Sequence, residues 1–280
     1  MKPLTETRAP ATSAPEANGG CLQGRHALVT GGARGIGLAV ASRLLADGAS
    51  VTLLGRDAAG LAQALSGLRA DRAGAMVGAV CADVADAAAV AQACAQAVAE
   101  RGAIAILVNN AGQAVSEPFH RTDAALWQAM LAVNLTGVFH CTQAVLPAML
   151  AAGWGRVVNV ASTAGLVGYA YVSAYCAAKH GVIGLTRALA LETARKGVTV
   201  NAVCPGYTDT GIVADAVRNI AAKTGAGEAD ARARLTAVNP QGRLVRPEEV
   251  AEAVAFLCRP AAAASNGQAL PVDGGEVMAG

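Results

Sequence analysis

A tyrosine and a lysine stand four residues apart in the stretch YCAAK, as Tyr175 and Lys179. Residues at this spacing share one face of a helix. A phenol has a pKa of about 10, so it acts as an acid or base near neutral pH only when its surroundings lower that value. A neighbouring ammonium does so because it stabilises the phenolate. The pair predicts proton transfer by Tyr175, provided that a helix begins near Ser173 or Ala174.

Two other tyrosines precede this pair and lack a lysine partner. The residue four places after Tyr169 is Ser173, and the residue four places after Tyr171 is Tyr175 itself. Tyr169 and Tyr171, together with Val172, are interpreted either as a wall of the substrate pocket or as plain packing.

A serine and an asparagine are candidates to complete the proton-transfer site. Ser162 ends the apolar run RVVNVAS, thirteen residues before Tyr175. If that run is a strand of a parallel sheet, its hydroxyl emerges at the carboxyl edge, where ligands bind. There it could hold a carbonyl oxygen beside the phenol. Asn134 lies in the apolar stretch LAVNLTG, where an amide is costly unless it is hydrogen-bonded.

A glycine-rich turn follows the first apolar run, in ALVTGGARGIGLAVA. Gly31, Gly35 and Gly37 stand between a predicted strand and a predicted helix. Such a turn lets backbone N–H groups approach a pyrophosphate at the helix N-terminus. The alternative is a turn chosen for packing alone. The strand–turn–helix context favours dinucleotide binding.

Seven short apolar runs alternate with longer helical stretches, and these elements must position the residues above. The runs span residues 26–30, 50–54, 75–80, 105–109, 156–161, 198–203 and 268–273. They are nearly continuous in apolar residues, which favours strands that are covered on both faces. The sequence therefore predicts an α/β fold, a single-domain Rossmann-type doubly wound parallel sheet of about seven strands with helices on both faces.

The domain organisation follows from the same pass along the chain. Residues 22–280 are expected to form one dinucleotide-binding catalytic domain, and residues 1–21, which are polar and rich in Pro, Ala and Thr, a mobile N-terminal tail. The segment 208–246 breaks the strand–helix rhythm and is more polar. We expect it to act as a substrate lid.

Composition excludes several classes of function. Among 280 residues, 54% are hydrophobic, and the net charge is only +2, which gives no case for a nucleic-acid partner. The first twenty residues contain no apolar h-region and are not expected to be a signal peptide, and no apolar run is expected to reach the roughly 18 residues of a membrane span. Seven cysteines without a C-x-x-C pair predict reduced, mostly buried thiols in a cytoplasmic protein, and no metal site.

These motifs together resemble the short-chain dehydrogenase/reductase family across about residues 22–276. The resemblance rests on Thr30, Gly31, Gly35, Gly37, Asn109-Asn110-Ala111-Gly112, Asn134, Ser162, Tyr175, Lys179 and Pro205-Gly206, which occur in the family order. It implies hydride transfer between a nicotinamide and a carbonyl carbon, with Tyr175 supplying the proton and Ser162 orienting the carbonyl. It further implies that Lys179 lowers the pKa of Tyr175 and holds the nicotinamide ribose, that Asn134 holds a relay water, and that the chain forms a homotetramer through helices at 123–151 and 173–196.

The resemblance also implies a set of cofactor contacts. This set comprises Gly31, Arg34, Gly35, Ile36, Gly37, Arg56, Asp83, Val84, Asn110, Ala111, Gly112, Tyr175, Lys179, Pro205, Gly206, Thr208 and Thr210. NAD-binding members usually place an acid after the second strand, for the ribose 2′-OH. Gly55 takes that place here and Arg56 follows it, which favours the 2′-phosphate of NADP(H). NAD(H) stays open, because Asp57 comes next and Arg34 could simply face solvent.

Two branches of the family are similar to this chain, the 3-oxoacyl-thioester reductases and the D-3-hydroxybutyrate dehydrogenases. The second branch clamps a free carboxylate with His and Lys near the catalytic pair, plus a Gln. Ala164 and Val172 stand at the first two places, and Gln113 is displaced by one. A buried carboxylate without a cationic partner is costly. The polyketide reductases carry a Gly-Gly-Lys-Gln signature from which STAGLVG departs.

The expected substrate is therefore an acyl thioester, carried on CoA or an acyl carrier protein. Candidate substrate contacts are Gln113, Ala164, Tyr169, Val172 and Tyr207. One alternative is an NAD-dependent dehydrogenase of a free hydroxy acid or of a secondary or cyclic alcohol. A non-enzymatic alternative is a nicotinamide-sensing binding protein. The presence of all four candidate catalytic residues argues against it: Asn134, Ser162, Tyr175 and Lys179.

Overall fold

A seven-stranded parallel sheet runs through the centre of the protein, in a computed structural model that describes residues 20–278. Its strands are β1 (His26–Thr30), β2 (Ser50–Gly55), β3 (Val77–Cys81), β4 (Ile104–Asn109), β5 (Gly155–Val160), β6 (Val198–Pro205) and β7 (Ala269–Val272). They are arranged in the order β3-β2-β1-β4-β5-β6-β7. The order reverses between β1 and β4, and ligands of such sheets bind beyond the carboxyl ends of the strands at this point. The expected fold class is confirmed.

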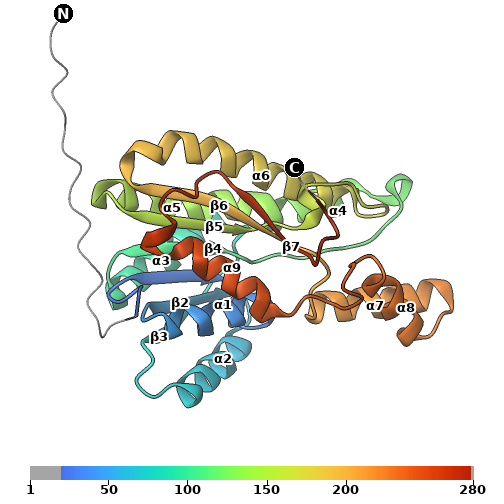
Figure 1. Cartoon of the computed structure of the whole chain (residues 1–280), viewed down its shortest axis with the longest axis horizontal. Helices are drawn as coiled ribbons and strands as arrows, with labels where there is room; N and C mark the ends of the chain where they lie inside the picture. The colour runs from blue at the N-terminus through green and yellow to red at the C-terminus, as the bar shows by residue number, and fades with distance from the viewer. Residues whose placement is uncertain (1–19, 279–280) are drawn as a thin grey trace, which may run out of the picture.

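Helices cover both faces of the sheet (Figure 1). One face carries α1 (Gly35–Ala46), α2 (Ala58–Asp71) and α9 (Pro247–Cys258), which share an apolar core with the strands. The other face carries α3 (Ala87–Arg101), α5 (Gly137–Ala152) and α6 (Ser173–Thr193). Short helical turns complete the chain at Phe119–Arg121, Thr163–Gly165, Ala194–Lys196 and Pro260–Ala262. Burial on both faces explains why the strand sequences are apolar throughout.

Aspartates begin three of these helices. The side chains of Asp57 and Asp86 accept hydrogen bonds from backbone N–H groups in the first turns of α2 and α3. Asp123 does the same for α4 (Ala124–Leu131). These caps satisfy donors that a helix N-terminus otherwise leaves without a partner.

The helix before β5 is continuous from Ala124 to Ala152, with a π-helical turn at Ala132–Thr136 between α4 and α5. By length and composition alone it could cross a membrane. The expectation that no apolar run reaches that length is therefore wrong for this stretch. The helix packs against α3, α6 and β4 in the core, and core helices meet the same two criteria. π turns often occur at functional sites.

The segment between β6 and α9 forms α7 (Gly211–Thr224) and α8 (Glu228–Thr236), which project from the side of the sheet (Figure 1). These helices have an apolar cluster of their own, formed by Val213, Val217, Ala231, Leu235 and Leu244. Lys223 Nζ donates to Ser116 O at 3.0 Å, which ties α7 to the loop after β4. The role of this segment as a lid stays a prediction.

The expected N-terminal tail lies almost wholly outside the described residues. Gly20 and Cys21 belong to a hydrogen-bonded turn that leads to the buried Leu22, with Gln23 N donating to Gly20 O at 2.9 Å.

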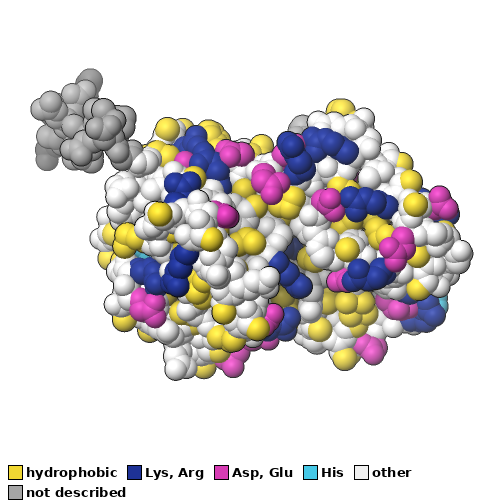
Figure 2. Space-filling view, turned by 90° about the horizontal axis from the view of Figure 1, so that it is seen from below, with side chains coloured by type: hydrophobic (Ala, Val, Ile, Leu, Met, Phe, Trp, Pro, Cys, Tyr) yellow, Lys and Arg dark blue, Asp and Glu magenta, His cyan; other side chains and the backbone are white. Residues whose placement is uncertain are grey.

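All seven cysteines are free thiols, and all but Cys21 and Cys81 are buried, as expected. Figure 2 shows one face of the molecule, on which basic and acidic side chains are interspersed instead of gathered by sign.

Candidate active site

A groove of about 1070 Å³ opens at the carboxyl edge of the sheet, beside the glycine turn. Its walls come from α1, α2, the ends of β2 to β4 and the start of α7. The predicted cofactor contacts that line it are Gly31, Arg34, Gly35, Ile36, Arg56, Asp83, Val84, Asn110, Ala111, Gly112 and Thr210. Gly37, Pro205, Gly206, Thr208, Tyr175 and Lys179 are not among the residues of this wall.

The glycine turn allows three backbone segments to meet. Gly31 has a φ of +63°, and a β-carbon there would lie 2.9 Å from Asn110 Nδ2. A β-carbon on Gly37 would lie 2.2 Å from Gly31 O, so Gly37 faces the turn and not the groove. Gly37 thus lets the first turn of α1 approach the end of β1. The result is an open helix N-terminus at the groove, which suits a pyrophosphate.

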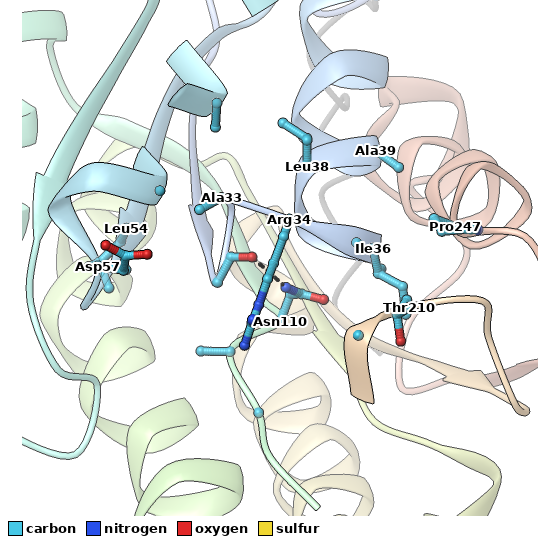
Figure 3. A pocket seen from close by; sticks show the side chains of 18 of the residues that line it. Ala33, Arg34, Ile36, Leu38, Ala39, Leu54, Asp57, Asn110, Thr210 and Pro247 are labelled. Atoms are coloured by element: carbon cyan, nitrogen blue, oxygen red, sulfur yellow. Dashed lines mark hydrogen bonds between the residues drawn. The ribbon is translucent and has the colours of Figure 1, made fainter. Parts of the chain in front are cut away.

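Two arginines reach this groove. Figure 3 shows the Arg34 side chain extending into it from the loop before α1, with Asp57 at the opposite edge from Thr210. Arg56 is 64% exposed, and its Nη1 lies 3.4 Å from Asp83 Oδ2. Asp57 accepts a hydrogen bond from Ala59 N at 3.1 Å as the cap of α2. That capping bond gives Asp57 a structural role, which weakens its claim on a ribose hydroxyl.

The chain after β4 is fastened to β1. Thr30 Oγ1 accepts hydrogen bonds from the backbone N–H groups of Asn110 and Ala111, both at 2.9 Å. Asn110 Nδ2 donates to Thr30 O at 3.0 Å and to Gly31 O at 3.2 Å. Asn110 therefore holds two loops together in addition to lining the groove. The sequence placed Thr30 in the glycine motif, but it did not indicate that the Thr30 hydroxyl fastens the chain after β4.

The loop after β6 closes the groove from the α7 side. Gly206 N donates to Val272 O at 3.1 Å, and the buried Thr208 donates through its hydroxyl to Gly206 O at 3.0 Å. Thr210 directly precedes α7, and a β-carbon on Gly35 would lie 3.2 Å from Thr210 Cγ2. Thr210 and the glycine turn thus face each other across a narrow part of the groove.

Tyr175 lies in the first turn of α6, which begins at Ser173 as expected. Ser162 follows β5, and its Oγ accepts a hydrogen bond from Ala164 N at 3.1 Å. Burial raises the pKa of Tyr175 to about 12, while a hydrogen bond with Ser162 acts in the lowering direction. This influence indicates that the serine hydroxyl and the phenol are close, and their joint role in proton transfer stays a prediction.

Lys179 lies behind Tyr175 and is itself buried. Its Nζ donates to Val160 O at 2.9 Å and stands 5.6 Å from the centroid of the Tyr175 ring. Burial lowers the pKa of Lys179 to about 8. Burial is thus the largest influence on the pKa of both groups. That Lys179 lowers the pKa of Tyr175 in the working enzyme stays a prediction.

Asn134 is fully buried within the π turn. Its Nδ2 donates to Gln113 O at 2.9 Å and Met130 O at 3.0 Å, and its Oδ1 accepts from Gln113 N at 3.2 Å. These hydrogen bonds give partners to both the nitrogen and the oxygen of the buried Asn134 side chain. A β-carbon on Gly112 would lie 3.0 Å from Asn134 Oδ1 and 3.8 Å from Lys179 Nζ, so the three residues meet where the groove ends.

Hydrogen bonds hold several predicted substrate contacts in specific positions. Gln113 Nε2 donates to Ala129 O at 3.2 Å, so this side chain folds back onto α4. Ala164 is 4% exposed, and its N–H serves Ser162. Val172 precedes α6 and is half-buried.

Tyr171 is 64% exposed and has a φ of +68°. Its carbonyl oxygen accepts a hydrogen bond from Glu117 N at 2.8 Å. This carbonyl links the loop of the tyrosines to the chain after β4.

Tyr169 and Tyr207 make the aromatic contact that the sequence could not specify. Their ring centroids lie 6.3 Å apart at an interplanar angle of 79°. The Tyr169 hydroxyl bonds Thr163 Oγ1 at 2.9 Å and also Glu276, from the chain after β7. Glu276 escaped sequence reasoning, because no motif or spacing connects it with residues more than a hundred positions earlier.

A buried polar chain supports the floor of the site. Asn109 Nδ2 donates to Thr142 Oγ1 at 3.1 Å and to Asn159 Oδ1 at 2.9 Å. Asn159 Nδ2 donates in turn to Thr186 Oγ1 at 2.9 Å. These bonds join β4, β5, α5 and α6 behind the catalytic side chains. They fit the interpretation of Asn109 as a structural residue at the strand end.

A nicotinamide dinucleotide fits the residues present. The glycine turn brings the N-terminus of α1 to the groove, and the groove extends from Arg56 to Gly112. Gly112 in turn borders Lys179, whose Nζ lies 5.6 Å from the centroid of the Tyr175 ring. Within residues 20–278, this is where a group that carries hydride would come closest to Tyr175.

Comparisons with known proteins agree with this geometry. The family model of short chain dehydrogenases matches residues 25–221. The chain is 42% identical to D-beta-hydroxybutyrate dehydrogenase of Cupriavidus necator, over 91% of this chain and 99% of that protein. It is 45% identical to cis-4-hydroxycyclohexanecarboxylate dehydrogenase of Sinomonas cyclohexanicum, over 90% of this chain and 96% of that protein.

A solved structure is also similar. The crystal structure of an actinorhodin polyketide ketoreductase with NADPH superimposes with a TM-score of 0.87 at 42% sequence identity. The match covers 90% of this chain and 97% of the ketoreductase. These similar proteins act on different substrates by name, so similarity alone does not choose among them.

Proposed function

The chain belongs to the short-chain dehydrogenase family, and from that premise we propose that it transfers hydride between NADP(H) and the 3-oxo or 3-hydroxy carbon of an acyl thioester. The observation that carries the proposal is the half-buried pair of Tyr175 and Ser162 near the end of a dinucleotide-sized groove, with Ala164 and Val172 where a carboxylate clamp would need cations. The substrate acid is therefore best accommodated as a neutral thioester.

The roles of the side chains follow from where each atom stands. Tyr175 is the proton donor in reduction and the proton acceptor in oxidation, at its phenol oxygen. The Ser162 hydroxyl orients the substrate oxygen next to that phenol. Lys179 and Asn134 hold the backbone around the end of the groove. A bound nicotinamide supplies or accepts the hydride.

We expect oxidation and reduction to respond differently to pH. With its pKa raised to about 12, the Tyr175 phenol keeps its proton at neutral pH. Reduction uses this proton, so its kcat/KM should change little between pH 6 and 8. Oxidation needs the phenolate, whose fraction rises up to about tenfold per pH unit below the pKa. Initial rates in both directions test this, and an oxidation rate that falls with rising pH would contradict it.

The preference for NADP(H) rests on Arg34 and Arg56. Replacing Arg56 by alanine should raise the KM for NADPH by roughly tenfold to a hundredfold, because a charge-assisted hydrogen bond is lost. The KM for NADH should stay within about twofold. The matched control is Arg72→Ala, an exposed arginine just after α2. Equal losses with both cofactors would contradict the assignment and favour NAD(H).

The function is tested with acetoacetyl-CoA and with 3-oxoacyl groups on acyl carrier protein, with NADPH and NADH. Turnover of these thioesters supports the proposal. A second candidate, a dehydrogenase of a free hydroxy acid or cyclic alcohol, is favoured by the similarity to the Cupriavidus and Sinomonas enzymes. Efficient turnover of 3-hydroxybutyrate or a cyclohexanol, without activity on any thioester, would replace the first proposal by the second.

A further inference from the structure

A carboxylate from the C-terminal segment lies beside the loop that follows Ser162. Glu276 comes shortly after β7, and the Tyr169 hydroxyl donates a hydrogen bond to its Oε1. The same hydroxyl lies 2.9 Å from Thr163 Oγ1. A phenol has a single proton, so the Thr163 hydroxyl is the donor in that second bond. A chain of hydrogen bonds thus runs from Glu276 to the neighbour of the catalytic serine.

The second oxygen of this carboxylate is buried without a hydrogen-bond partner within residues 20–278. A β-carbon on Gly206 would lie 2.9 Å from Glu276 Oε2, so this oxygen rests against the bare backbone after β6. Burial raises the pKa of the Glu276 carboxyl, the bond from Tyr169 lowers it, and the nearby Asp273 raises it. Buried acceptors rarely stay without a donor, so Oε2 is suited to receive one from a ligand.

Tyr207 packs against Tyr169, the hydrogen-bond partner of this carboxylate. Its ring packs edge-on against Tyr169, as described above. After burial, the charge of Glu276 is the next cause that raises the pKa of Tyr207. Tyr207 in turn contributes to the raised pKa of Tyr175, after burial and Cys176. The geometric link to the site is the Tyr169 hydroxyl, which joins Glu276 to Thr163, the residue directly after Ser162.

We propose that Glu276 accepts a hydrogen bond from an O–H or N–H group of the substrate and thereby selects neutral substrates over carboxylates. This inference rests on the proposed function and narrows its substrate class. A free 3-oxo acid would bring a second negative charge into a poorly solvated pocket, where like charges repel strongly. A thioester of the same acid lacks that charge, and an amide on its thiol arm provides a donor.

The test compares two substrates that share the reacting group. Acetoacetate is anionic, whereas the N-acetylcysteamine thioester of acetoacetate is neutral and carries an amide N–H. We expect the unmodified protein to prefer the thioester. Glu276→Gln should raise the kcat/KM for acetoacetate, relative to the thioester, by about tenfold or more. Glu192→Gln makes the same change at an exposed position near the end of α6 and should leave the ratio unchanged.

A second variant separates charge from architecture. Tyr169→Phe breaks the same Tyr169–Glu276 bond but leaves the carboxylate in place. If the charge of Glu276 sets the preference, Tyr169→Phe keeps the preference for the neutral substrate, and only Glu276→Gln weakens it. If both variants change the ratio equally, the bond merely anchors the C-terminal segment and the proposal is overturned.

One measurement needs no variant and no turnover. Butyramide and butyrate have the same carbon chain, but only butyramide is neutral and donates N–H groups. In fluorescence titrations of the unmodified protein with NADPH bound, butyramide should bind about tenfold more tightly or better. Equal or weaker binding of butyramide would overturn the proposal. If no 3-oxoacyl thioester is turned over, the proposed function fails, while this titration still decides the role of Glu276.

Discussion

Replacing Tyr175 by phenylalanine is expected to lower kcat by about a thousandfold, within the range that a positioned proton donor contributes. The side chain is half-buried, and phenylalanine keeps its ring, so the fold and the groove should be retained. Cofactor affinity should change little, because Gly31, Arg34 and Asn110 bound the groove from other elements. Stopped-flow rates of hydride transfer, together with fluorescence titration of NADPH, separate the two effects.

The matched control for this variant is Tyr171→Phe. Tyr171 belongs to the loop before α6, is largely exposed and donates no side-chain hydrogen bond to the described residues. It should keep full activity. A Tyr175→Phe protein with undiminished turnover would show that another group transfers the proton. A protein that binds NADPH but turns over no carbonyl compound, with or without the substitution, would instead favour the nicotinamide-sensing alternative.

Gly37→Ala is expected to lower kcat/KM for the cofactor by about a hundredfold, because a shift of about 1 Å at a reacting site costs roughly that much. The new β-carbon would meet Gly31 O at 2.2 Å and Asn110 Nδ2 at 2.5 Å. Both are parts of the turn that positions the N-terminus of α1, so the turn must move. The crowding should also cost about 1–3 kcal/mol of folding free energy.

Gly184→Ala provides the control for this substitution. Gly184 lies in α6, is exposed, and a β-carbon there would meet no heavy atom within 4 Å. Alanine favours the helix over glycine by roughly 0.5–1 kcal/mol, so this variant should be equally or more stable. Thermal unfolding with and without NADPH measures both effects. A Gly37→Ala protein that NADPH stabilises as much as it stabilises the parent would refute the role given to the turn.

The sheet could be predicted because parallel strands have a strong local signature. Strands buried on both faces must be apolar along their whole length, and each of the seven runs became a strand within one or two residues at either end. The glycine turn and the start of α6 at Ser173 were equally readable. In both, local chemistry and tertiary structure require the same residues.

The electrostatics of the site could not be predicted, because burial depends on the whole packed structure. Helical spacing correctly joined Tyr175 and Lys179, but it gave no indication that Lys179 is buried and Tyr175 half-buried. Their pKa values of about 12 and about 8 reflect this desolvation, opposite in sign for an acid and a base. The inward turn of the Gln113 side chain and the arrival of Glu276 likewise depend on contacts between distant segments.

The two ends of the described chain lie in unlike places. Leu22 N donates to Asp47 O, and this entry to β1 lies at the amino edge of the sheet, whereas Glu276 packs against the loops at the carboxyl edge. A peptide or affinity tag added after Gly280 would begin five positions beyond Glu276. Purification handles therefore belong at the N-terminus, which is far in sequence from the carboxylate proposed to contact the substrate.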